Sequence, residues 1–341
     1  MSRGPLWLVV PEGIDDPARV SGGNVYDRRV RDGLAARGWD VRTLAVAPDA
    51  EADALAHVPD GGLVLLDGLL AIASPTAAVA EAGRLRIVGL AHMSVGAFPR
   101  ASEVEIDAES YALRAFERVI VPSGWLRDDL VQRGVTRAER VVVAEPGADE
   151  ASVARGSGTG GAFLCVGAVS EHKGHDTLVE ALAGLAADPG WSCTFAGSAE
   201  TEPVFVARIA SRAQESGVGD RIAWTGVLDP AALAAVYDRT DLVIAPSRTE
   251  SYGIAVGDAL RRGIPVLASR VGGLTEAVRP AEAGILVPAG DPAALEEALR
   301  EWLTDGGLRE AMTRAAREAA PSRPRWSDTA ETIDRALREL P

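Results

Sequence analysis

The sequence contains few cysteines, few aromatic residues and no long apolar run. Only two of its 341 residues are cysteine, which is too few for a disulfide framework. Cys165 and Cys193 both lie in apolar runs, so we interpret them as buried thiols in a reducing compartment. No apolar run reaches the roughly 18–20 residues of a membrane span, and Leu6–Val10 is too short for a secretory signal. These absences predict a cytoplasmic protein.

Positive charge is also scarce. The chain carries 35 lysines and arginines against 49 aspartates and glutamates, which gives a formal net charge of −14. Nucleic-acid-binding domains usually have a basic balance, and an anionic membrane repels an acidic chain on average. We therefore expect no nucleic-acid partner and disfavour membrane contact. The sequence leaves open whether the protein forms a homodimer.

Lysine is almost absent because arginine takes its place. Lys173 is the only lysine among the 35 basic residues. Arginine and lysine are not interchangeable, because a guanidinium is a planar fork and an ammonium is a compact point charge. A single lysine can survive by chance, but its surroundings, described below, favour a functional role for Lys173.

Short β-branched runs alternate with longer amphipathic segments, a pattern typical of βαβ units and parallel sheets. Strands are expected at Leu6–Val10, Val41–Val46, Leu63–Leu66, Arg86–Leu90, Val119–Val121, Val141–Val143, Ala162–Val166, Ser192–Ala196, Arg221–Thr225, Leu242–Ala245, Val266–Ser269 and Gly284–Val287. Helices are expected at Tyr26–Arg37, Gly124–Arg133, Thr177–Ala187, Ala231–Tyr237, Ile254–Arg262, Pro292–Leu303, Leu308–Ala319 and Trp326–Leu340.

A stretch rich in glycine and serine, Glu150 to Gly161, interrupts this alternation and is predicted to be a flexible linker. The fold class is therefore α/β, with two Rossmann-like domains facing a cleft. We place the first domain at residues 1–150 and the second at 151–322. Residues 323–341 should form a C-terminal helix that packs back on the first domain. In such folds ligands bind at the carboxyl ends of the strands.

Three segments contain residues suited to chemistry. In the first, Gly22 and Gly23 lie between the first strand and the first helix, where their amides can face an anion. This is not the dinucleotide fingerprint, because no G-x-G-x-x-G follows the strand. A Gly-Gly pair alone is often only a turn.

The second segment, Val166 to Asp176, follows the first strand of the second domain and contains Lys173. An ammonium at this position can neutralise a diphosphate. His172 and His175 are three residues apart, but no third ligand lies nearby, so a metal site is disfavoured. His175 is expected to cap or pack rather than to act directly.

The third segment, Pro246 to Asp258, follows the strand Leu242–Ala245 and opens a helix. Glu250 in the turn can accept hydrogen bonds from sugar hydroxyls. Asp258, eight residues later on the helix, can accept both hydroxyls of a ribose. The amides near Tyr252 and Gly253 lie at the positive end of the helix, which suits a diphosphate between the two acids.

Taken together, these motifs resemble the retaining, nucleotide-sugar-dependent glycosyltransferases of the GT-B fold, in family 4. The resemblance covers nearly the whole chain and depends on the order and spacing of its motifs. These are the Gly-Gly turn, His92, Pro122-Ser123, Glu145 to Asp149, Lys173-Gly174-His175, Pro246 to Gly253 and Gly272 to Glu276. The segment from Glu250 to Asp258 has the spacing of the family's E-x7-E signature.

The resemblance implies an acceptor-binding first domain and a nucleotide-sugar-binding second domain. Its implied catalytic residues are His92, Lys173 and Glu250, with His92 hydrogen-bonded to the donor sugar. The implied donor-binding residues are Gly22, Gly23, Arg248, Ser251, Tyr252, Gly253, Ile254 and Asp258. The expected acceptor-binding residues are Asn24, Tyr26, Ser94 and Arg100. No cofactor and no metal is expected, because no Asp-x-Asp motif lies at a strand end.

Two positions depart from the family pattern. Its second acid is usually glutamate, and here it is the shorter Asp258. The family also usually carries an arginine after the strand that precedes the lysine, where this sequence has Ala168. Arg248 or another cation has to replace it if the phosphates are to meet two positive charges.

The resemblance implies transfer of a sugar from a UDP or GDP sugar to a hydroxyl of a small soluble acceptor, such as a secondary metabolite, a cyclitol or a pterin. Two alternatives on the same fold remain: a nucleotide-sugar epimerase, and a degenerate nucleotide-sugar-binding protein. A nicotinamide oxidoreductase is disfavoured by the missing fingerprint.

Overall fold

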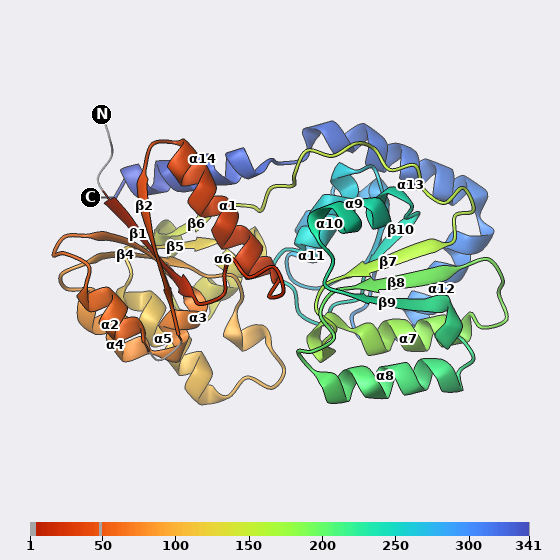
Figure 1. Cartoon of the computed structure of the whole chain (residues 1–341), viewed down its shortest axis with the longest axis horizontal. Helices are drawn as coiled ribbons and strands as arrows, with labels where there is room; N and C mark the ends of the chain where they lie inside the picture. Colours follow the sequence, from red (N-terminus) through yellow and green to blue (C-terminus); the bar gives the residue numbers. More distant parts are fainter. Residues whose placement is uncertain (1–4, 48–49, 341) are drawn as a thin grey trace. The chain divides into compact units, whose positions relative to one another are not determined.

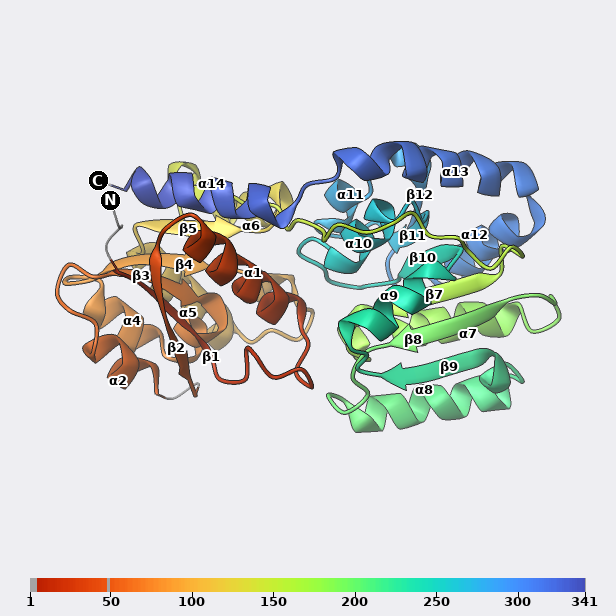
Figure 2. The same cartoon turned by 45° about the horizontal axis from the view of Figure 1, so that its top comes forward.

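The chain divides into two compact units, which are described one at a time (Figures 1 and 2). The structure is a computed structural model that describes residues 5–47 and 50–340. Unit 1 comprises Met1–Gly147 and Pro324–Pro341, and unit 2 comprises Ala148–Arg323. Each unit is built around one six-stranded sheet in which all neighbouring strands are parallel. The predicted α/β class is therefore confirmed.

The sheet of unit 1 has the strand order β2-β1-β3-β4-β5-β6. Its strands are β1 Pro5–Pro11, β2 Asp40–Val46, β3 Leu63–Asp67, β4 Arg86–Leu90, β5 Arg118–Val121 and β6 Val141–Val143. Its helices are α1 Gly22–Ala36, α2 Glu51–Ala56, α3 Gly68–Ala73, α4 Pro75–Glu81, α5 Glu103–Ala115, α6 Gly124–Gln132 and α14 Trp326–Arg338. Short 3₁₀ turns lie at Val95–Ala97 and Ala138–Arg140.

Helices cover both faces of this sheet. Val64 and Leu66 pack in a cluster with apolar side chains of α2 to α6, whereas the intervening Leu65 packs in a cluster with α1 and α14. This alternation follows from the two-residue period of a strand. Because both faces are buried, the strands are apolar along their whole length, which is why they could be predicted from sequence.

Helix α14 belongs to unit 1 and lies beside α1 (Figure 2). Ile333 is fully buried with Leu34 of α1 in one apolar cluster. A Cβ added at Gly33 would approach the Cβ of Ala330 to 2.5 Å, so the two helices meet where one of them has no side chain. Thr329 also donates a hydrogen bond of 2.6 Å to the carbonyl of Glu145.

The sheet of unit 2 has the order β12-β11-β10-β7-β8-β9. Its strands are β7 Ala162–Val166, β8 Ser192–Ala196, β9 Ile222–Gly226, β10 Leu242–Ala245, β11 Val266–Ser269 and β12 Gly284–Val287. Its helices are α7 His175–Gly184, α8 Pro203–Glu215, α9 Pro230–Asp238, α10 Ile254–Arg261, α11 Leu274–Ala277, α12 Pro292–Thr304 and α13 Gly306–Ala319. Short 3₁₀ turns lie at Glu171–Lys173, Gly219–Arg221, Ala281–Ala283 and Ala320–Ser322.

Two apolar clusters flank the second sheet. One gathers side chains of α7, α8 and α12, and the other gathers side chains of α9, α10 and α11. The buried thiols Cys165 and Cys193 belong to the first cluster, as the sequence predicted. Burial raises the pKa of Cys165 to about 12, which keeps this thiol protonated and unreactive.

The segment Glu150 to Gly161 is held against unit 2, so the prediction of a flexible linker there is wrong. The amide of Ala154 donates to the carbonyl of Arg262, and the amide of Gly156 donates to the carbonyl of Asp238. The carboxylate of Asp241 accepts from the amides of Ser157 and Ala162. Glycine and serine therefore mark a segment without periodic structure here, while side-chain and backbone acceptors of α9, α10 and β10 fix its course.

One acidic side chain of unit 1 is buried without compensation. Glu51 is fully buried, and neither of its carboxylate oxygens has a hydrogen-bond partner. Burial, with a smaller contribution from the carboxylate of Asp67, raises the pKa of Glu51 to about 8. Within the described residues, no helix is long and apolar enough to cross a membrane.

Truncating Ile333 should destabilise unit 1, because α14 completes its core. We expect Ile333→Ala to lower the free energy of unfolding by about 2–5 kcal/mol in urea denaturation. The matched control is Arg335→Ala on the same helix, whose side chain is 66% exposed. The control should change stability by less than about 0.5 kcal/mol. Equal effects of the two variants would show that α14 does not contribute to the core.

The raised pKa of Glu51 predicts a pH-dependent stability. A folded-state pKa above the ordinary value favours the protonated form, so this contribution is complete at low pH and is lost as pH rises toward about 8. Glu51→Gln has no such proton to lose. We expect the variant to gain at least about 2 kcal/mol over the wild type between about pH 5 and about pH 9, since one pKa unit is worth about 1.4 kcal/mol.

Urea denaturation at both pH values measures this difference, and the other titrating groups cancel in the comparison. Asp53→Asn on the exposed side of the same helix is the control, and it should follow the wild type at both pH values. A pH-independent difference between Glu51→Gln and the wild type would contradict the prediction.

Candidate functional site

Two loops of unit 2 meet at the carboxyl ends of neighbouring strands. One loop follows β7 and carries Lys173, and the other follows β10 and carries Glu250. These strands adjoin in the sheet although they are the first and fourth of the unit, so the order of connections reverses between them. Such a switch point is where open α/β sheets bind ligands.

Backbone contacts hold the two loops together. The amide of Arg248 donates to the carbonyl of His172 over 2.7 Å. Gly174 has a left-handed backbone with φ of 71°, and a Cβ there would approach the carbonyl oxygen of Pro246 to 2.0 Å. Only glycine permits this approach, so Gly174 accounts for the short distance between its neighbour Lys173 and the β10 loop.

Lys173 and Glu250 form an ion pair. The Nζ of Lys173 donates to Oε2 of Glu250 over 2.6 Å, and the two side chains are 26% and 14% exposed. The hydroxyl of Ser247 lies 3.5 Å from the same carboxylate oxygen. The structure therefore brings together two of the three residues predicted to be catalytic, at the edge where open α/β sheets generally bind ligands.

Gly272 and Gly273 support the turn that carries Glu250. The amide of Gly273 donates to the carbonyl of Glu250 over 3.0 Å. Added Cβ atoms at Gly272 and Gly273 would lie 1.9 Å and 2.0 Å from the carbonyl oxygens of Glu250 and Ser251. The second Gly-Gly pair thus fixes the acidic turn through close backbone packing.

Helix α10 begins directly after this turn. Gly253 is its N-cap with φ of 98°, and Ile254 is its first residue, so the helix presents its positive end beside Glu250. Ser251 is buried, and its hydroxyl has no hydrogen-bond partner among the described residues. Tyr252 is buried against α10. These four predicted donor-binding residues therefore cluster around one helix end.

Asp258 lies on α10 with a side chain that is 26% exposed. Its carboxylate lies 3.8 Å from the guanidinium of Arg262, one turn further on. Its role toward a ribose stays a prediction.

Arg248 is engaged inside unit 2. Its guanidinium donates two hydrogen bonds to the carboxylate of Asp176, at 2.7 and 3.1 Å, one to the carbonyl of Glu171 and one to the hydroxyl of Thr177. Four of its five N–H donors are thus used to tie the β10 loop to α7. This bidentate pair gives Arg248 a structural role, and only Nε remains for a phosphate.

The two histidines near Lys173 lie in different surroundings. His175 is fully buried, its Nε2 lies 3.6 Å from the Sγ of Cys165, and its ring packs edge-on against Phe195. Burial lowers the pKa of His175 to about 4, so the ring is neutral in the core. His172 accepts or donates at Nδ1 to the hydroxyl of Ser170. His175 thus packs, as expected.

In unit 1 the first Gly-Gly pair opens α1. The hydroxyl of Ser21 caps the helix by accepting from the amide of Asn24, so α1 begins at Gly22, four residues earlier than predicted. The amides of Gly22 and Gly23 make no hydrogen bond to described residues. Gly23 also adjoins the ring of His92, because a Cβ there would lie 3.4 Å from Cδ2.

His92 follows β4 and is surrounded by acidic groups. Its Nε2 lies 2.8 Å from Oδ1 of Asp27 and 3.3 Å from Oδ2 of Asp67. Burial alone would lower the pKa of His92, but the two carboxylates outweigh it and raise this pKa above its ordinary value. Asp27 and Asp67 were not singled out from sequence. The available signals were an acid on the buried face of a helix and an acid ending an apolar strand.

The predicted acceptor-binding residues are dispersed. Tyr26 is buried, and its hydroxyl donates to the carbonyl of Ala144. Ser94 is also buried, and its hydroxyl donates to Asp129, which in turn pairs with Arg133. Asn24 donates to the carbonyl of Arg19, and Arg100 lies exposed in the loop before α5. Tyr26 packs edge to face against His92, with the ring centroids 5.3 Å apart.

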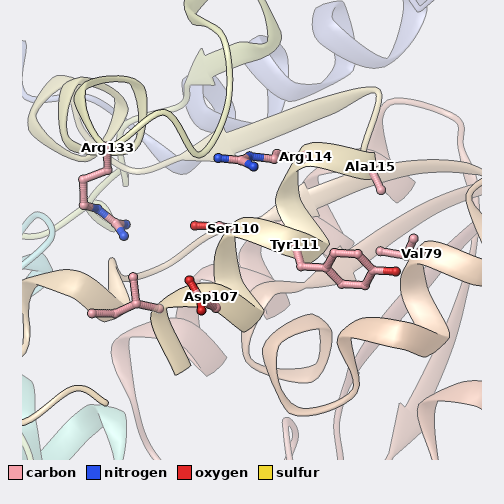
Figure 3. Close-up of a pocket in the computed structure, with 8 residues that line it drawn as sticks. Val79, Asp107, Ser110, Tyr111, Arg114, Ala115 and Arg133 are labelled. Atoms are coloured by element: carbon pink, nitrogen blue, oxygen red, sulfur yellow. The ribbon is translucent and has the colours of Figure 1, made fainter. Parts of the chain in front are cut away.

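A separate pocket of about 690 Å³ lies among the helices of unit 1 (Figure 3). Tyr111, Ser110 and Arg114 of α5 line it together with Arg133. Arg114 donates to the carbonyl of Gly134, and Arg133 pairs with Glu109, so each guanidinium has a partner within unit 1. None of the catalytic, donor-binding or acceptor-binding residues predicted from sequence lines this pocket.

Comparisons with known proteins find similar sequences and similar folds. Residues 153–319 match the family described as "Glycosyl transferases group 1", and this stretch lies within unit 2. A curated relative, D-inositol 3-phosphate glycosyltransferase of Acidothermus cellulolyticus, is 32% identical over 245 residues. The match covers 66% of this chain and 54% of the relative, so the chain spans about half the length of the curated relatives it matches.

Solved structures extend the likeness to the whole fold. Sucrose-phosphate synthase of Thermosynechococcus elongatus superposes with a TM-score of 0.83 and 23% identity, over 99% of both chains. HepE of Anabaena, solved in complex with UDP-glucose, gives a TM-score of 0.80 at 18% identity, over 98% of this chain and 100% of that chain. These structural matches show the GT-B fold, and the family match lies within unit 2.

Proposed function

We propose that the protein is a retaining, metal-independent glycosyltransferase of family 4, which moves a sugar from a UDP or GDP sugar to a hydroxyl of a small soluble acceptor. The observation that carries the proposal is the Lys173–Glu250 pair at the switch point of unit 2, beside the start of α10. It combines one cation, one carboxylate and a helix N-terminus within two loops.

These three features match the parts of a nucleotide sugar. The ammonium of Lys173 and the helix end neutralise a diphosphate. The carboxylate of Glu250 accepts hydrogen bonds from hydroxyls of the sugar. A phosphate oxygen that binds the ammonium competes with Glu250 for it, and this competition frees carboxylate oxygens for the sugar. Among the solved structures of the same fold, HepE was solved with UDP and with UDP-glucose.

The proposed chemistry is loss of the nucleoside diphosphate from the anomeric carbon with attack by the acceptor on the same face. The bond from carbon to the phosphate oxygen breaks as the bond to the acceptor oxygen forms, and the leaving phosphate takes the acceptor proton. The protein then acts by positioning and by stabilising the negative charge of the departing diphosphate. Lys173 supplies the compensating positive charge without a metal, and His92 binds the donor sugar.

The acceptor is the least defined part. The curated relative is named for D-inositol 3-phosphate, a cyclitol phosphate. A small polyol of this kind is therefore the first acceptor to test, by mass-spectrometric detection of a glycosylated product with UDP- and GDP-sugars. Two results would favour the alternatives on the same fold. One is release of free nucleotide without a glycosylated product, and the other is epimerisation of the donor in the absence of an acceptor.

Removing Lys173 should weaken binding of nucleoside diphosphates. UDP, GDP and ADP are titrated calorimetrically into the wild type and Lys173→Ala. One nucleotide should bind the wild type, and the variant should lose about 10- to 100-fold in affinity, because a charge-assisted hydrogen bond is worth roughly 1.5–3 kcal/mol. Arg212→Ala is the control, because it removes an exposed cation of unit 2 that lies far from Lys173 in the sequence.

Glu250→Gln provides the complementary variant. It removes the negative charge that pairs with Lys173, so UDP should bind at least as tightly as to the wild type. Sugar transfer should fall at least about tenfold through loss of a charged acceptor for the sugar hydroxyls. If Glu250→Gln and Lys173→Ala weakened UDP binding equally, the division of roles between cation and carboxylate would be wrong.

Asp258 should make nucleotide binding depend on the hydroxyl groups of the ribose. In the wild type, 2′,3′-dideoxy-UDP should bind at least about fivefold more weakly than UDP, because a carboxylate loses its two hydroxyl partners. In Asp258→Ala the two nucleotides should bind alike. Glu297→Ala on the exposed side of α12 is the matched control and should preserve the wild-type ratio. An unchanged ratio in Asp258→Ala would place the ribose elsewhere.

A further inference from the structure

The ring of His92 is held from one side only. Both carboxylate contacts, to Asp27 at 2.8 Å and to Asp67 at 3.3 Å, converge on Nε2. The other ring nitrogen, Nδ1, has no hydrogen-bond partner among the described residues. Tyr26 packs edge-on against the ring and Gly23 adjoins it, so the ring has little freedom to rotate.

The two acids are themselves fixed. Asp67 is 2% exposed, and its other oxygen accepts from the amide of Leu69 at 2.7 Å as the N-cap of α3. Asp27 is 1% exposed on the buried face of α1, and its Oδ2 has no hydrogen-bond partner. Neither acid forms an ion pair with a lysine or arginine in the described part of the chain. The imidazole is therefore the group that can balance their charge.

Charge balance decides the protonation state of the ring. Two carboxylates this deeply buried cannot both ionise without a compensating cation. Glu51 of α2 is a third acid, and it interacts electrostatically with Asp67. Because burial and Asp67 raise the pKa of Glu51 to about 8, its carboxyl group is protonated and neutral at neutral pH. Tyr26 is the remaining titratable neighbour, and its phenol is protonated because burial raises its pKa. Among the described groups that contact the two acids, the imidazole is the one that can carry a positive charge.

We propose that Asp27 and Asp67 are positioning residues that together hold His92 as an imidazolium, so that its Nδ1–H is a fixed hydrogen-bond donor to an oxygen of a bound ligand. The ligand group at this position must then be an acceptor, such as a hydroxyl or phosphate oxygen. Its assignment to the donor sugar rests on the proposed function, whereas the two-carboxylate clamp does not.

The clamp has a consequence for pH. An unperturbed histidine titrates close to pH 6.5, whereas this ring should keep its charge through neutral pH. Replacing either acid by asparagine retains an oxygen that can accept from Nε2 but removes one negative charge. The ring should then lose its proton near or below neutral pH, and Nδ1 should become an acceptor.

The test is a pH titration of the histidine side chains by ¹⁵N NMR on the full chain. The sequence has four histidines, and His92→Gln assigns the signal of interest. In the wild type, His92 should show both ring nitrogens protonated from about pH 6 to about pH 8. In Asp27→Asn and in Asp67→Asn it should titrate within or below this range. Asp32→Asn, on the exposed side of α1, should leave it unchanged.

Kinetics give a second readout, the pH profile of the rate, which a purely structural role of Asp27 would leave unchanged. If sugar transfer is found, Asp27→Asn should lose rate progressively as pH rises from about 6 to about 8, while the wild type should not. Asp27→Glu, which restores the charge, should recover the wild-type pH profile in part even if its overall rate is lower.

Each contrary outcome overturns the clamp. It is wrong if His92 of the wild type titrates at or below about pH 6.5, or if neither asparagine variant changes the titration. It is also wrong if a chelator shifts the His92 signal, because the three ligating atoms lie within 4.8 Å of one another and such a shift would reveal a bound metal. Absence of sugar transfer with a normal NMR result would refute the proposed function and leave the clamp intact.

Discussion

The close approach of backbone to backbone in unit 2 is the constraint on which its site depends. Parallel strands deliver their side chains to one edge of a sheet, but they do not by themselves bring two loops into contact. Gly174 lies against the carbonyl of Pro246, and Gly272 and Gly273 lie against those of Glu250 and Ser251. Side chains at these positions would force the loops apart, and the 2.6 Å contact between Lys173 and Glu250 would be lost.

Unit 1 also gathers charged groups at the carboxyl edge of its sheet, but there the acids are buried. Asp27 follows the first strand, Asp67 ends the third and His92 follows the fourth, so three polar groups converge through topology alone. Unit 2 pairs one cation with one acid near solvent, where partner exchange costs little. The acids of unit 1 are buried, where an unpaired charge is expensive, so their partner must stay in place.

The strands could be predicted because burial on both faces makes them continuously apolar. All twelve lie within one residue of their expected bounds at both ends. Short helices such as α2 and α3 were missed, since six residues give too little periodicity. The first turn of α1 was missed because Gly22 and Gly23 are poor helix formers, and the capping hydroxyl of Ser21 outweighs that propensity.

The site was predictable only where it depends on local sequence. Lys173, Glu250 and the start of α10 occupy loops that directly follow strands, and their spacing along the chain is informative. The partner of Arg248 was not predictable, because Asp176 lies 72 residues away in sequence and only the sheet order makes them neighbours. The same holds for Asp27 and His92, which are separated by 65 residues.

This difference bears on how the missing arginine at position 168 should be understood. If Arg248 replaced it, the guanidinium would have to leave a bidentate carboxylate and two further acceptors. That exchange costs several charge-assisted hydrogen bonds, each worth roughly 1.5–3 kcal/mol, and would loosen the loop that carries Glu250. Within unit 2, a diphosphate therefore depends on Lys173 and the amides at the start of α10, which makes the only lysine of the chain its least replaceable cation.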